Sequence, residues 1–186
     1  MLRLFDLILA VLGLVVGMPI LCVLMILGFL DTGSPLFFQT RVGRQQKLFI
    51  LVKFRTMKPG TVSVATHLAD VSVITRVGRF LRKLKLDELP QLWNVLKGEM
   101  SFVGPRPCLP DQIEVIEERK RRGVFDSRPG MTGLAQVDAI DMSTPELLAE
   151  TDAQMLKTLS LATYWKYILM TLSGKGSGDR IKEMAE

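Results

Sequence analysis

The sequence predicts an α+β fold, mainly helical with short β elements, joined to an apolar N-terminal membrane helix. Three observations support this fold class. Residues 7–30 carry no charged side chain, β-branched and aromatic residues concentrate in residues 34–58, and apolar residues recur at helical spacing in most of the remaining chain. Because the chain has 186 residues, we expect one membrane element over residues 1–30 and one membrane-associated domain over residues 31–186.

The apolar run is long enough to enter or cross a membrane. A helix over residues 7–30 rises roughly 36 Å, against a hydrocarbon core of about 30 Å. Pro19 lies near its middle, where it removes a backbone donor and predicts a kink. The residues alone leave two topologies open: a spanning helix with a tolerated kink, and a re-entrant helix that breaks at Met18-Pro19 and returns to the same face.

Basic residues predict the side of the membrane on which the domain lies. Arg3 alone precedes the apolar run, whereas Arg41, Arg44 and Lys47 follow it. Because lysine and arginine concentrate on the cytoplasmic side of membrane helices, we expect residues 31–186 at the cytoplasmic face in either topology. The net charge of +5 is consistent with attraction to anionic lipid of the inner membrane.

Composition argues against several other classes of protein. Only Cys22 and Cys108 are present, and Cys22 lies in the apolar run, so no disulfide framework is expected. No cluster of histidine or cysteine residues suggests a zinc site. Nucleic-acid binding is not expected, because no stripe of interleaved basic and aromatic residues occurs.

The first half of the domain has three predicted segments. Residues 34–58 predict two short strands or an extended hairpin, with the turn at residues 42–45. Residues 59–75 open with a Pro-Gly pair and mix small and polar side chains, which predicts a loop. In residues 76–86 the apolar side chains stand at helical spacing, so we expect a helix there.

A second helix is predicted to follow Asp87, with Pro90 in its first turn and Gly98 as its C-terminal stop. Its apolar face comprises Leu89, Leu92, Trp93 and Leu96. The next predicted elements are, in order, a helix over residues 110–122 whose E-E-R-K-R-R end suits a solvated face, a glycine-bearing turn over 128–133, a strand-like stretch over 134–137, and a helix over 145–159 with Thr144 as its N-cap.

The last apolar stretch, residues 159–172, carries Tyr164, Trp165 and Tyr167 among leucine, isoleucine and methionine. Core packing accounts for this pattern. A helix lying in the membrane interface accounts for it equally well, because Trp and Tyr rings favour that region. The sequence leaves both interpretations open. The glycine-rich tail at residues 174–178 predicts flexible chain.

The adjacent acids Asp87 and Glu88 are the candidate reactive groups. They stand at a predicted helix start, where free backbone N–H groups favour an ionised carboxylate and also a bound phosphate. An aspartate in this position is also a common N-cap, so the dipeptide alone does not establish a function. An ionised aspartate can attack phosphorus, and an acid pair can hold Mg²⁺ together with substrate phosphate oxygens.

The cations around the acid pair favour a phosphate ester as the substrate. Basic residues crowd the approach to the pair, and Arg106 follows between Pro105 and Pro107, which restrict its backbone. Arginine binds two phosphate oxygens at once. The candidate phosphate- and substrate-binding residues are Lys53, Arg55, Arg82, Arg106 and Arg128.

Three motifs together identify a family. L-D-E-L-P-Q-L-W-N-V-L-K-G-E-M-S-F-V-G-P-R-P at 86–107, K-F-R-T-M at 53–57 and R-P-G-M-T-G-L-A-Q-V at 128–137 closely resemble the bacterial monotopic phosphoglycosyl transferases, in the same order. The resemblance runs from about Leu4 to Asp152. Enzymes of this family transfer a sugar 1-phosphate from a UDP-sugar to polyprenol (undecaprenyl) phosphate and release UMP. This is the first membrane step in the assembly of O-antigen, capsule, exopolysaccharide or glycoprotein glycans.

The resemblance implies roles for individual residues. Asp87 is then the nucleophile, which forms a covalent phosphosugar intermediate that polyprenol phosphate attacks in a second step. Mg²⁺ is the implied cofactor, with Asp87, Glu88 and Glu99 as implied metal ligands. The motif positions associated with metal or phosphate binding are Glu88, Lys53, Arg82, Glu99 and Arg106.

The resemblance also favours the re-entrant topology, in which the helix breaks at a proline. The family commonly has a serine before this proline, whereas this chain has Met18-Pro19, so a hydroxyl that satisfies a freed carbonyl is missing. At residues 152–155 the sequence reads D-A-Q-M, where relatives often have an acid followed by paired tyrosines. The chain resembles a minimal catalytic form at the cytoplasmic face of the bacterial inner membrane. A homodimer is compatible with the sequence, which does not specify the oligomeric state.

Two rival functions remain open. In one, Asp87 is only a metal ligand and polyprenol phosphate attacks the UDP-sugar directly in a single step. In the other, the protein is a non-catalytic membrane scaffold whose basic face binds anionic lipid. The scaffold leaves the acid pair and the proline-flanked Arg106 unexplained. The sequence names neither the sugar nor the downstream pathway.

Overall fold

The computed structural model describes residues 2–61 and 71–175, and it confirms a mainly helical α+β fold with short strands. Two two-stranded sheets are present among these residues. The helices are α1 (Leu2–Thr32), α2 (Arg76–Lys83), α3 (Gln91–Lys97), α4 (Ile113–Arg121), α5 (Leu134–Val137), α6 (Pro145–Lys157) and α7 (Leu161–Leu172). The strands are β1 (Leu36–Val42), β2 (Leu48–Phe54), β3 (Ser101–Val103) and β4 (Gly130–Thr132), and the short 3₁₀ helices are η1 (Arg44–Gln46), η3 (Val71–Val73), η4 (Leu86–Glu88) and η5 (Val124–Asp126).

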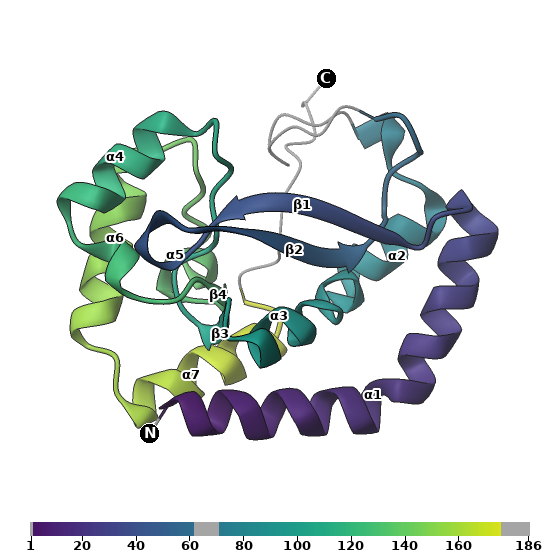
Figure 1. Ribbon diagram of the computed structural model, residues 1–186, viewed down its shortest axis with the longest axis horizontal. Coiled ribbons are helices and arrows are strands. Elements are labelled where there is room, and N and C mark those ends of the chain that lie inside the picture. Colours follow the sequence, from purple (N-terminus) through teal and green to yellow (C-terminus); the bar gives the residue numbers. More distant parts are fainter. Residues whose placement is uncertain (1, 62–70, 176–186) are drawn as a thin grey trace.

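Helix α1 is one long apolar helix that bends part-way along. It has Pro19 inside it, and Figure 1 shows one arm running along the lower edge of the molecule and the other rising along the right side. Judged by length and composition, α1 is the one helix among the described residues that could cross a membrane. The bend agrees with the kink that Pro19 predicts. Re-entrance into a membrane stays a prediction.

The first turns of α1 are bonded to the domain by polar side chains. Arg3 Nη2 donates a 2.8 Å hydrogen bond to the carbonyl of Val95. Asp6 is buried, and its Oδ1 accepts hydrogen bonds of 2.8 Å from the hydroxyls of Ser101 and Tyr164. A charge that the sequence places at the edge of a membrane segment therefore lies in the protein interior.

Strands β1 and β2 form the hairpin that the sequence predicts. They pair antiparallel from Leu36 opposite Phe54 to Val42 opposite Leu48, and η1 closes the turn. Gln45 has a left-handed backbone (φ 54°), which a tight turn requires. The hairpin positions the site, because its inward-facing side chains meet α3 and the segment after β3.

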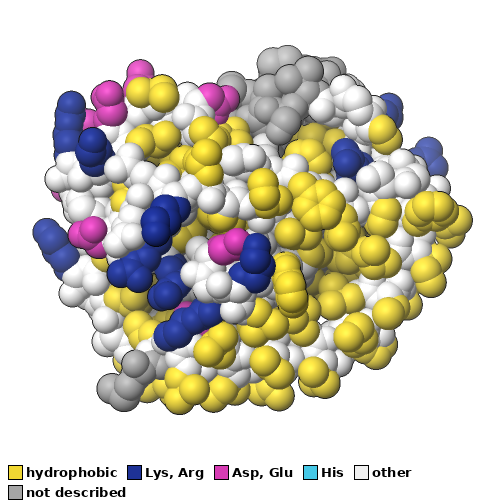
Figure 2. All heavy atoms as spheres, in the orientation of Figure 1, with side chains coloured by type: hydrophobic (Ala, Val, Ile, Leu, Met, Phe, Trp, Pro, Cys, Tyr) yellow, Lys and Arg dark blue, Asp and Glu magenta, His cyan; other side chains and the backbone are white. Residues whose placement is uncertain are grey.

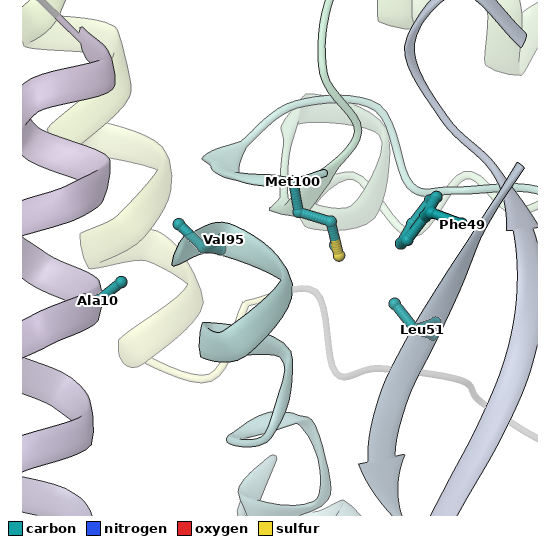
Figure 3. Packing of buried hydrophobic residues seen from close by; sticks show 5 residues of the cluster. All are labelled: Ala10, Phe49, Leu51, Val95 and Met100. Carbon is teal, nitrogen blue, oxygen red and sulfur yellow. The ribbon is translucent and has the colours of Figure 1, made fainter. Parts of the chain in front are cut away.

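A small apolar core joins three of these elements. Ala10 of α1, Val95 of α3 and Met100 pack with Phe49 and Leu51 of β2. Figure 3 shows α3 between α1 and the hairpin, with these side chains directed into the space between them. The apolar contact fixes α3, and with it the turn that carries the acid pair.

Two short predicted elements are wrong. Residues 134–137 form one helical turn, α5, because the amide of Val137 bonds to the carbonyl of Gly133, whereas the sequence predicts a strand. Residues 130–132 of the expected turn form β4, which pairs in parallel with β3. The conformation of such short segments depends on contacts with distant parts of the chain. At Gly130, for example, the backbone of Gly104 lies so close that an added Cβ would stand 2.1 Å from its amide nitrogen.

The helices predicted after the acid-pair motif are confirmed, with corrections to single residues. Segments 110–122 and 145–159 contain α4 and α6, and Thr144 occupies the N-cap of α6 without a capping hydrogen bond from its side chain. Arg119 is buried and does not belong to a solvated face. Trp93 is 56% exposed and so points away from the apolar face predicted for α3.

The surface carries a large apolar area along α1. Figure 2 shows apolar side chains covering the lower and right margins of the molecule, where α1 runs, and most of the cations on the left half and in the centre, with a few at the upper right. On α7, Tyr164 and Tyr167 are buried whereas Leu161, Leu169 and Leu172 are exposed, so one face of this helix belongs to the core. Parts of two predicted segments, the loop at 62–70 and the tail beyond residue 175, lie outside the described residues.

Candidate active site

The acid pair lies in a one-turn 3₁₀ helix just before α3. Helix η4 spans Leu86–Glu88, and α3 begins at Gln91 with Pro90 at its N-cap. The prediction that α3 begins at Asp87 is therefore wrong by one turn, because Pro90 interrupts the α-helical hydrogen bonding there. Lys85 precedes η4 in a left-handed conformation (φ 57°), a sparsely populated backbone state for a side-chain-bearing residue.

Glu88 forms an ion pair with Arg106 in the lining of a cavity. Its Oε1 stands 3.4 Å from Arg106 Nη1 and 3.5 Å from Nη2, so the guanidinium straddles one carboxylate oxygen. The cavity is lined by Arg41, Leu51, Lys53, Glu88, Gln91, Arg106, Pro107 and Gly130. Three cations and one carboxylate around one cavity make a site suited to an anion, with a carboxylate at its edge.

Asp87 is 8% exposed and is not part of the cavity lining, whereas its neighbour Glu88 is. The two carboxylates therefore differ in access although they are adjacent in sequence. Burial lowers the pKa of the neighbouring Lys85 ammonium, and the Arg106 cation lowers it further, whereas Glu88 opposes the shift. The lowered pKa therefore reflects mainly the partial burial of Lys85, which precedes the turn that holds the acids.

Lys53 and Arg41 reach the cavity from the hairpin. Lys53 is near the end of β2, and its ammonium lies 5.8 Å from the centre of the Phe37 ring. Arg41 is buried, its Nη2 donates to Gln39 Oε1 (2.6 Å) and its Nη1 donates to the Pro107 carbonyl (2.9 Å). Arg41 is not among the residues predicted to form the site; its charge predicts only the side of the membrane on which the domain lies.

A signal for Arg41 is nevertheless present in the sequence. Successive side chains of a strand point to opposite faces, so Gln39 and Arg41 share one face of β1. A long polar pair on the inner face of an otherwise apolar strand points to a polar site. Gln91 also lines the cavity, but its position on the first turn of α3 carries no comparable signal.

The other predicted substrate-binding cations lie outside the cavity lining. Arg55 donates to the carbonyls of Ser34 and Leu36 near the end of α1. Arg82 Nε donates to the Thr56 hydroxyl (2.8 Å), and its buried Nη1 has no hydrogen-bond partner among the described residues. Buried donors without a partner are rare in folded proteins, so this nitrogen is an exception that the described residues do not explain.

Arg128 lies at the opposite end of α3 from the acid pair. Its Nε donates to the carbonyl of Gly98, the C-cap of α3 (2.8 Å). Burial lowers the pKa of Arg128, and the nearby cations Arg3 and Arg44 lower it further. The hydrogen bond to Gly98 places Arg128 at the C-terminus of α3, where the helix dipole favours a positive charge.

Glu99 also follows the far end of α3. It accepts hydrogen bonds from Asn94 Nδ2 (2.7 Å) and Lys97 Nζ (2.5 Å). Within residues 2–61 and 71–175 no group of three or more His, Cys, Asp or Glu side chains comes together. The structure therefore does not bring Glu99 to Asp87 and Glu88. Two hard carboxylates still fit Mg²⁺, which is typically held by one or two carboxylates plus substrate phosphate oxygens.

Comparison with known proteins relates the chain to sugar transferases. Residues 1–175 match the family model described as bacterial sugar transferase. The chain is 39% identical over 171 residues to an uncharacterized sugar transferase, EpsL, of Bacillus subtilis, an alignment covering 91% of this chain and 84% of that protein. It is 35% identical over 188 residues to the UDP-N-acetylgalactosamine-undecaprenyl-phosphate N-acetylgalactosaminephosphotransferase of Aeromonas hydrophila, covering 92% of this chain and 44% of that one.

A third relative extends the comparison to a longer protein. The chain is 39% identical over 152 residues to the undecaprenyl-phosphate galactose phosphotransferase of Salmonella typhimurium. This alignment covers 73% of the chain and 32% of that protein, so the chain spans about a third of its length. The acid pair, the residues that line the cavity and the Pro105-Arg106-Pro107 segment all lie within residues 1–175, which the family model matches.

Proposed function

The chain belongs to the bacterial sugar transferase family, and on that premise we propose that it transfers a sugar 1-phosphate from a UDP-sugar to polyprenol (undecaprenyl) phosphate and releases UMP. The names of the Salmonella and Aeromonas relatives, which are undecaprenyl-phosphate sugar phosphotransferases, support the substrate class. The product would be the first lipid-linked intermediate of a bacterial glycoconjugate.

One structural observation carries the proposal. The Glu88 carboxylate meets Arg106 at the edge of a cavity that also holds Lys53, and Asp87 is adjacent in the same turn. Lys53 and Arg106 suit the oxygens of a diphosphate, because ammonium and guanidinium groups bind phosphate oxygens through charge-assisted hydrogen bonds. A carboxylate beside bound phosphorus is suited either to attack it or to hold a cation against it.

The reaction we propose has two displacement steps at one phosphorus atom. In the first, an Asp87 carboxylate oxygen bonds to the β-phosphorus of the UDP-sugar, and the bond from that phosphorus to the bridging oxygen breaks, so UMP leaves with the electron pair. In the second, a phosphate oxygen of polyprenol phosphate bonds to the same phosphorus and the Asp87 carboxylate leaves. The enzyme is regenerated, and the lipid carries a diphosphate-linked sugar.

Asp87 and Glu88 are the residues that would hold Mg²⁺. When bound, this ion supplies positive charge against the diphosphate oxygens. Glu88 keeps the Arg106 guanidinium turned toward the cavity through their ion pair. Lys53 and Arg106 then supply fixed positive charge where negative charge accumulates on the leaving UMP, which is the usual electrostatic contribution to phosphoryl transfer.

The proposed location is the cytoplasmic face of the inner membrane. The apolar surface of α1 has the character of a membrane-embedded element, and both arms of the helix pack on the same domain: Ala10 against α3 and Leu24 near Phe54 and Leu81. A re-entrant arrangement places the domain beside the headgroups, where the phosphate of a polyprenol chain is exposed and a soluble nucleotide sugar is accessible.

A one-step mechanism is a second candidate, and one observation favours it. Asp87 is buried and lies outside the cavity lining, whereas an attacking group must contact the phosphorus bound in the cavity. In the one-step reaction the polyprenol phosphate oxygen attacks the UDP-sugar directly, and the acid pair only holds the metal ion. In the two-step reaction the turn that carries Asp87 must open when the donor binds.

Replacement of Asp87 by asparagine tests the function. With the full chain in detergent or lipid nanodiscs, wild type is assayed for UMP release across a panel of UDP-sugars with polyprenol phosphate and Mg²⁺. We expect turnover with at least one donor, and loss of turnover in Asp87→Asn with membrane association retained. Asp111→Asn, at an exposed turn, is the matched control and should keep wild-type turnover.

Trapping separates the two mechanisms. Wild type incubated with a radiolabelled UDP-sugar and no lipid acceptor should carry the labelled phosphosugar on the protein, and Asp87→Asn should not. Turnover without any labelled adduct would exclude the two-step mechanism and support the one-step mechanism. Absence of turnover with every UDP-sugar would overturn the proposed function and favour the lipid-binding scaffold.

A further inference from the structure

The segment of residues 105–108, which presents Arg106 to the cavity, is held by its carbonyl groups. Neither Pro105 nor Pro107 has a backbone N–H, so this segment lacks two of the donors that a regular strand or helix would use. Each of its four carbonyls instead accepts a hydrogen bond, and the donors come from three elements, β1, α4 and β4. The donors are Gly130 N to Pro105 (2.9 Å), Arg119 Nη1 to Arg106 (2.7 Å), Arg41 Nη1 to Pro107 (2.9 Å) and Val42 N to Cys108 (2.9 Å).

The donor to the Arg106 carbonyl is a buried arginine with a buried partner. Side chains of Arg119 and Asp152 are only 2% and 1% exposed. Asp152 Oδ2 accepts from Arg119 Nη2 at 2.7 Å and from Nε at 3.0 Å. Asp152 Oδ1 is also buried and has no hydrogen-bond partner among the described residues. Arg119 comes from α4 and Asp152 from α6, which lie side by side in Figure 1.

A buried ion pair of this kind contributes little net stability to a fold. Removing two charges from water costs about as much as their attraction returns, and apolar residues of similar volume often serve better. The guanidinium, however, is a rigid planar fork. Because Asp152 holds two of its nitrogens, the third, Nη1, is aimed at the Arg106 carbonyl.

We propose that Arg119 and Asp152 are positioning residues that act on the reaction through Arg106. Asp152 orients the Arg119 guanidinium, Arg119 holds the Arg106 peptide, and the Arg106 side chain is thereby kept against Glu88 in the cavity. The effect on catalysis rests on the proposed transferase function, whereas the effect on the placement of Arg106 does not. The pair stands outside the cavity lining, so it would not contact the nucleotide sugar in that cavity.

The competing explanation is that the pair only joins α4 to α6. That explanation predicts a general loss of stability and no special dependence on Arg106. Leu148 provides the matched control, because it is buried on α6 in the same apolar cluster as Val115 of α4. Leu148→Ala weakens the α4–α6 interface without touching the ion pair.

The kinetic test compares Asp152→Asn in two backgrounds. In the full-length wild-type chain, we expect Asp152→Asn to lower kcat/KM for the UDP-sugar on the order of tenfold to a hundredfold, the size of effect that a small misplacement of a binding group produces. In the Arg106→Ala background the same substitution should have no further effect, because the group through which it acts is gone. Leu148→Ala should lower the melting temperature and leave kcat/KM near the wild-type value.

The structural test is independent of activity. Structures of wild type and Asp152→Asn should show the Arg106 guanidinium withdrawn from Glu88 in the variant. An equal fall of kcat/KM in both backgrounds, or an unchanged Arg106 in the variant structure, would overturn the proposal. If wild type turns over no UDP-sugar, the proposed function fails while the structural comparison still decides whether the pair positions Arg106.

Discussion

The hydroxyl of Tyr164 donates a 2.8 Å hydrogen bond to Asp6 Oδ1 and joins α7 to α1 across 158 residues of sequence. The same oxygen accepts from the Ser101 hydroxyl and from the Phe102 amide. Three donors from β3 and α7 therefore converge on one carboxylate of α1. Fixing α1 in this way also fixes α3, because Ala10 packs on Val95.

Replacement of Asp6 by alanine should destabilise the protein substantially. The substitution leaves three donors without their acceptor, and unsatisfied buried donors are costly, so we expect a loss of about 3 kcal/mol in the free energy of unfolding. Thermal unfolding in detergent measures it as a lower melting temperature. Asp31→Ala, at the other end of α1, is the control: its buried Oδ2 has no hydrogen-bond partner among the described residues, so its loss should matter little. Equal melting temperatures for the two variants would contradict this account.

The tyrosines should resist ionisation in alkali. Tyr164 and Tyr167 are the two tyrosines of the chain, and burial raises the pKa of each. The Asp6 carboxylate raises the pKa of Tyr164 further, and Asp138 does so at Tyr167. Titration of the native protein followed by tyrosinate absorbance should therefore show no ionisation near pH 10, about the ordinary value.

Linkage gives the direction of the effect on stability. Because the folded-state pKa of these tyrosines lies above the unfolded value of about 10, their contribution is fully present below about pH 10 and is lost as pH rises through the folded pKa. Tyrosinate should appear together with the loss of helical circular dichroism. A titration step at the ordinary tyrosine pKa in a protein that keeps its helical signal would refute the prediction.

Loss of the Glu88 charge should affect activity far more than stability. Its ion pair with Arg106 is partly exposed, and such pairs contribute about 0–1 kcal/mol, so Glu88→Gln should melt near the wild-type temperature. If Glu88 holds Arg106 over the cavity, kcat/KM for the UDP-sugar should fall roughly tenfold or more. Glu118→Gln removes ion pairs with Arg121 and Arg122, of which the pair with Arg122 is about as exposed as the Glu88–Arg106 pair, and it should leave kcat/KM unchanged. A Glu88→Gln variant with full activity would remove Glu88 from the site.

The sequence alone predicts correctly those elements that have a clear apolar period or a recognisable turn. The hairpin of β1 and β2, the kink expected at Pro19 and helices α4 and α6 are visible as patterns of apolar residues, glycine and proline. The strand predicted over residues 134–137 is wrong because four residues carry no reliable period. Their conformation depends on packing against parts of the chain that no local pattern specifies.

The same distinction holds for the site. The acid pair, Lys53 and Arg106 stand in local motifs that predict them, whereas Arg119 stands in a basic run that predicts a solvated face. Its burial depends on Asp152, which is 33 residues away in sequence, and charge alone predicts exposure. Long-range partners of this kind emerge only when the chain has folded.

Alanine at Gly130 should disrupt the pairing of β3 with β4. A Cβ there would stand 2.1 Å from the amide nitrogen of Gly104, a backbone atom that cannot rotate away. We expect a loss of about 3 kcal/mol in the free energy of unfolding and lower transferase activity, because the Gly130 amide also supports the Pro105 carbonyl. Gly17→Ala is the control, since a Cβ added at Gly17 would meet no atom within 4 Å. If Gly130→Ala melts at the same temperature as Gly17→Ala, the close approach of these two strands is wrong.

The topology of α1 can be decided by cysteine labelling. In a Cys22→Ser, Cys108→Ala background, single cysteines replace Leu4 and Ser34, which are exposed at the two ends of the helix. A re-entrant helix leaves both ends in the cytoplasm, because Arg3 and the hairpin bond to one domain. A membrane-impermeant maleimide should then label neither position in intact spheroplasts and both after lysis. A spanning helix would instead expose position 4 in intact spheroplasts, and it would separate Arg3 from the carbonyls of α3 that it contacts. Labelling of position 4 from outside would therefore contradict both the re-entrant topology and the packing of α1 on the domain.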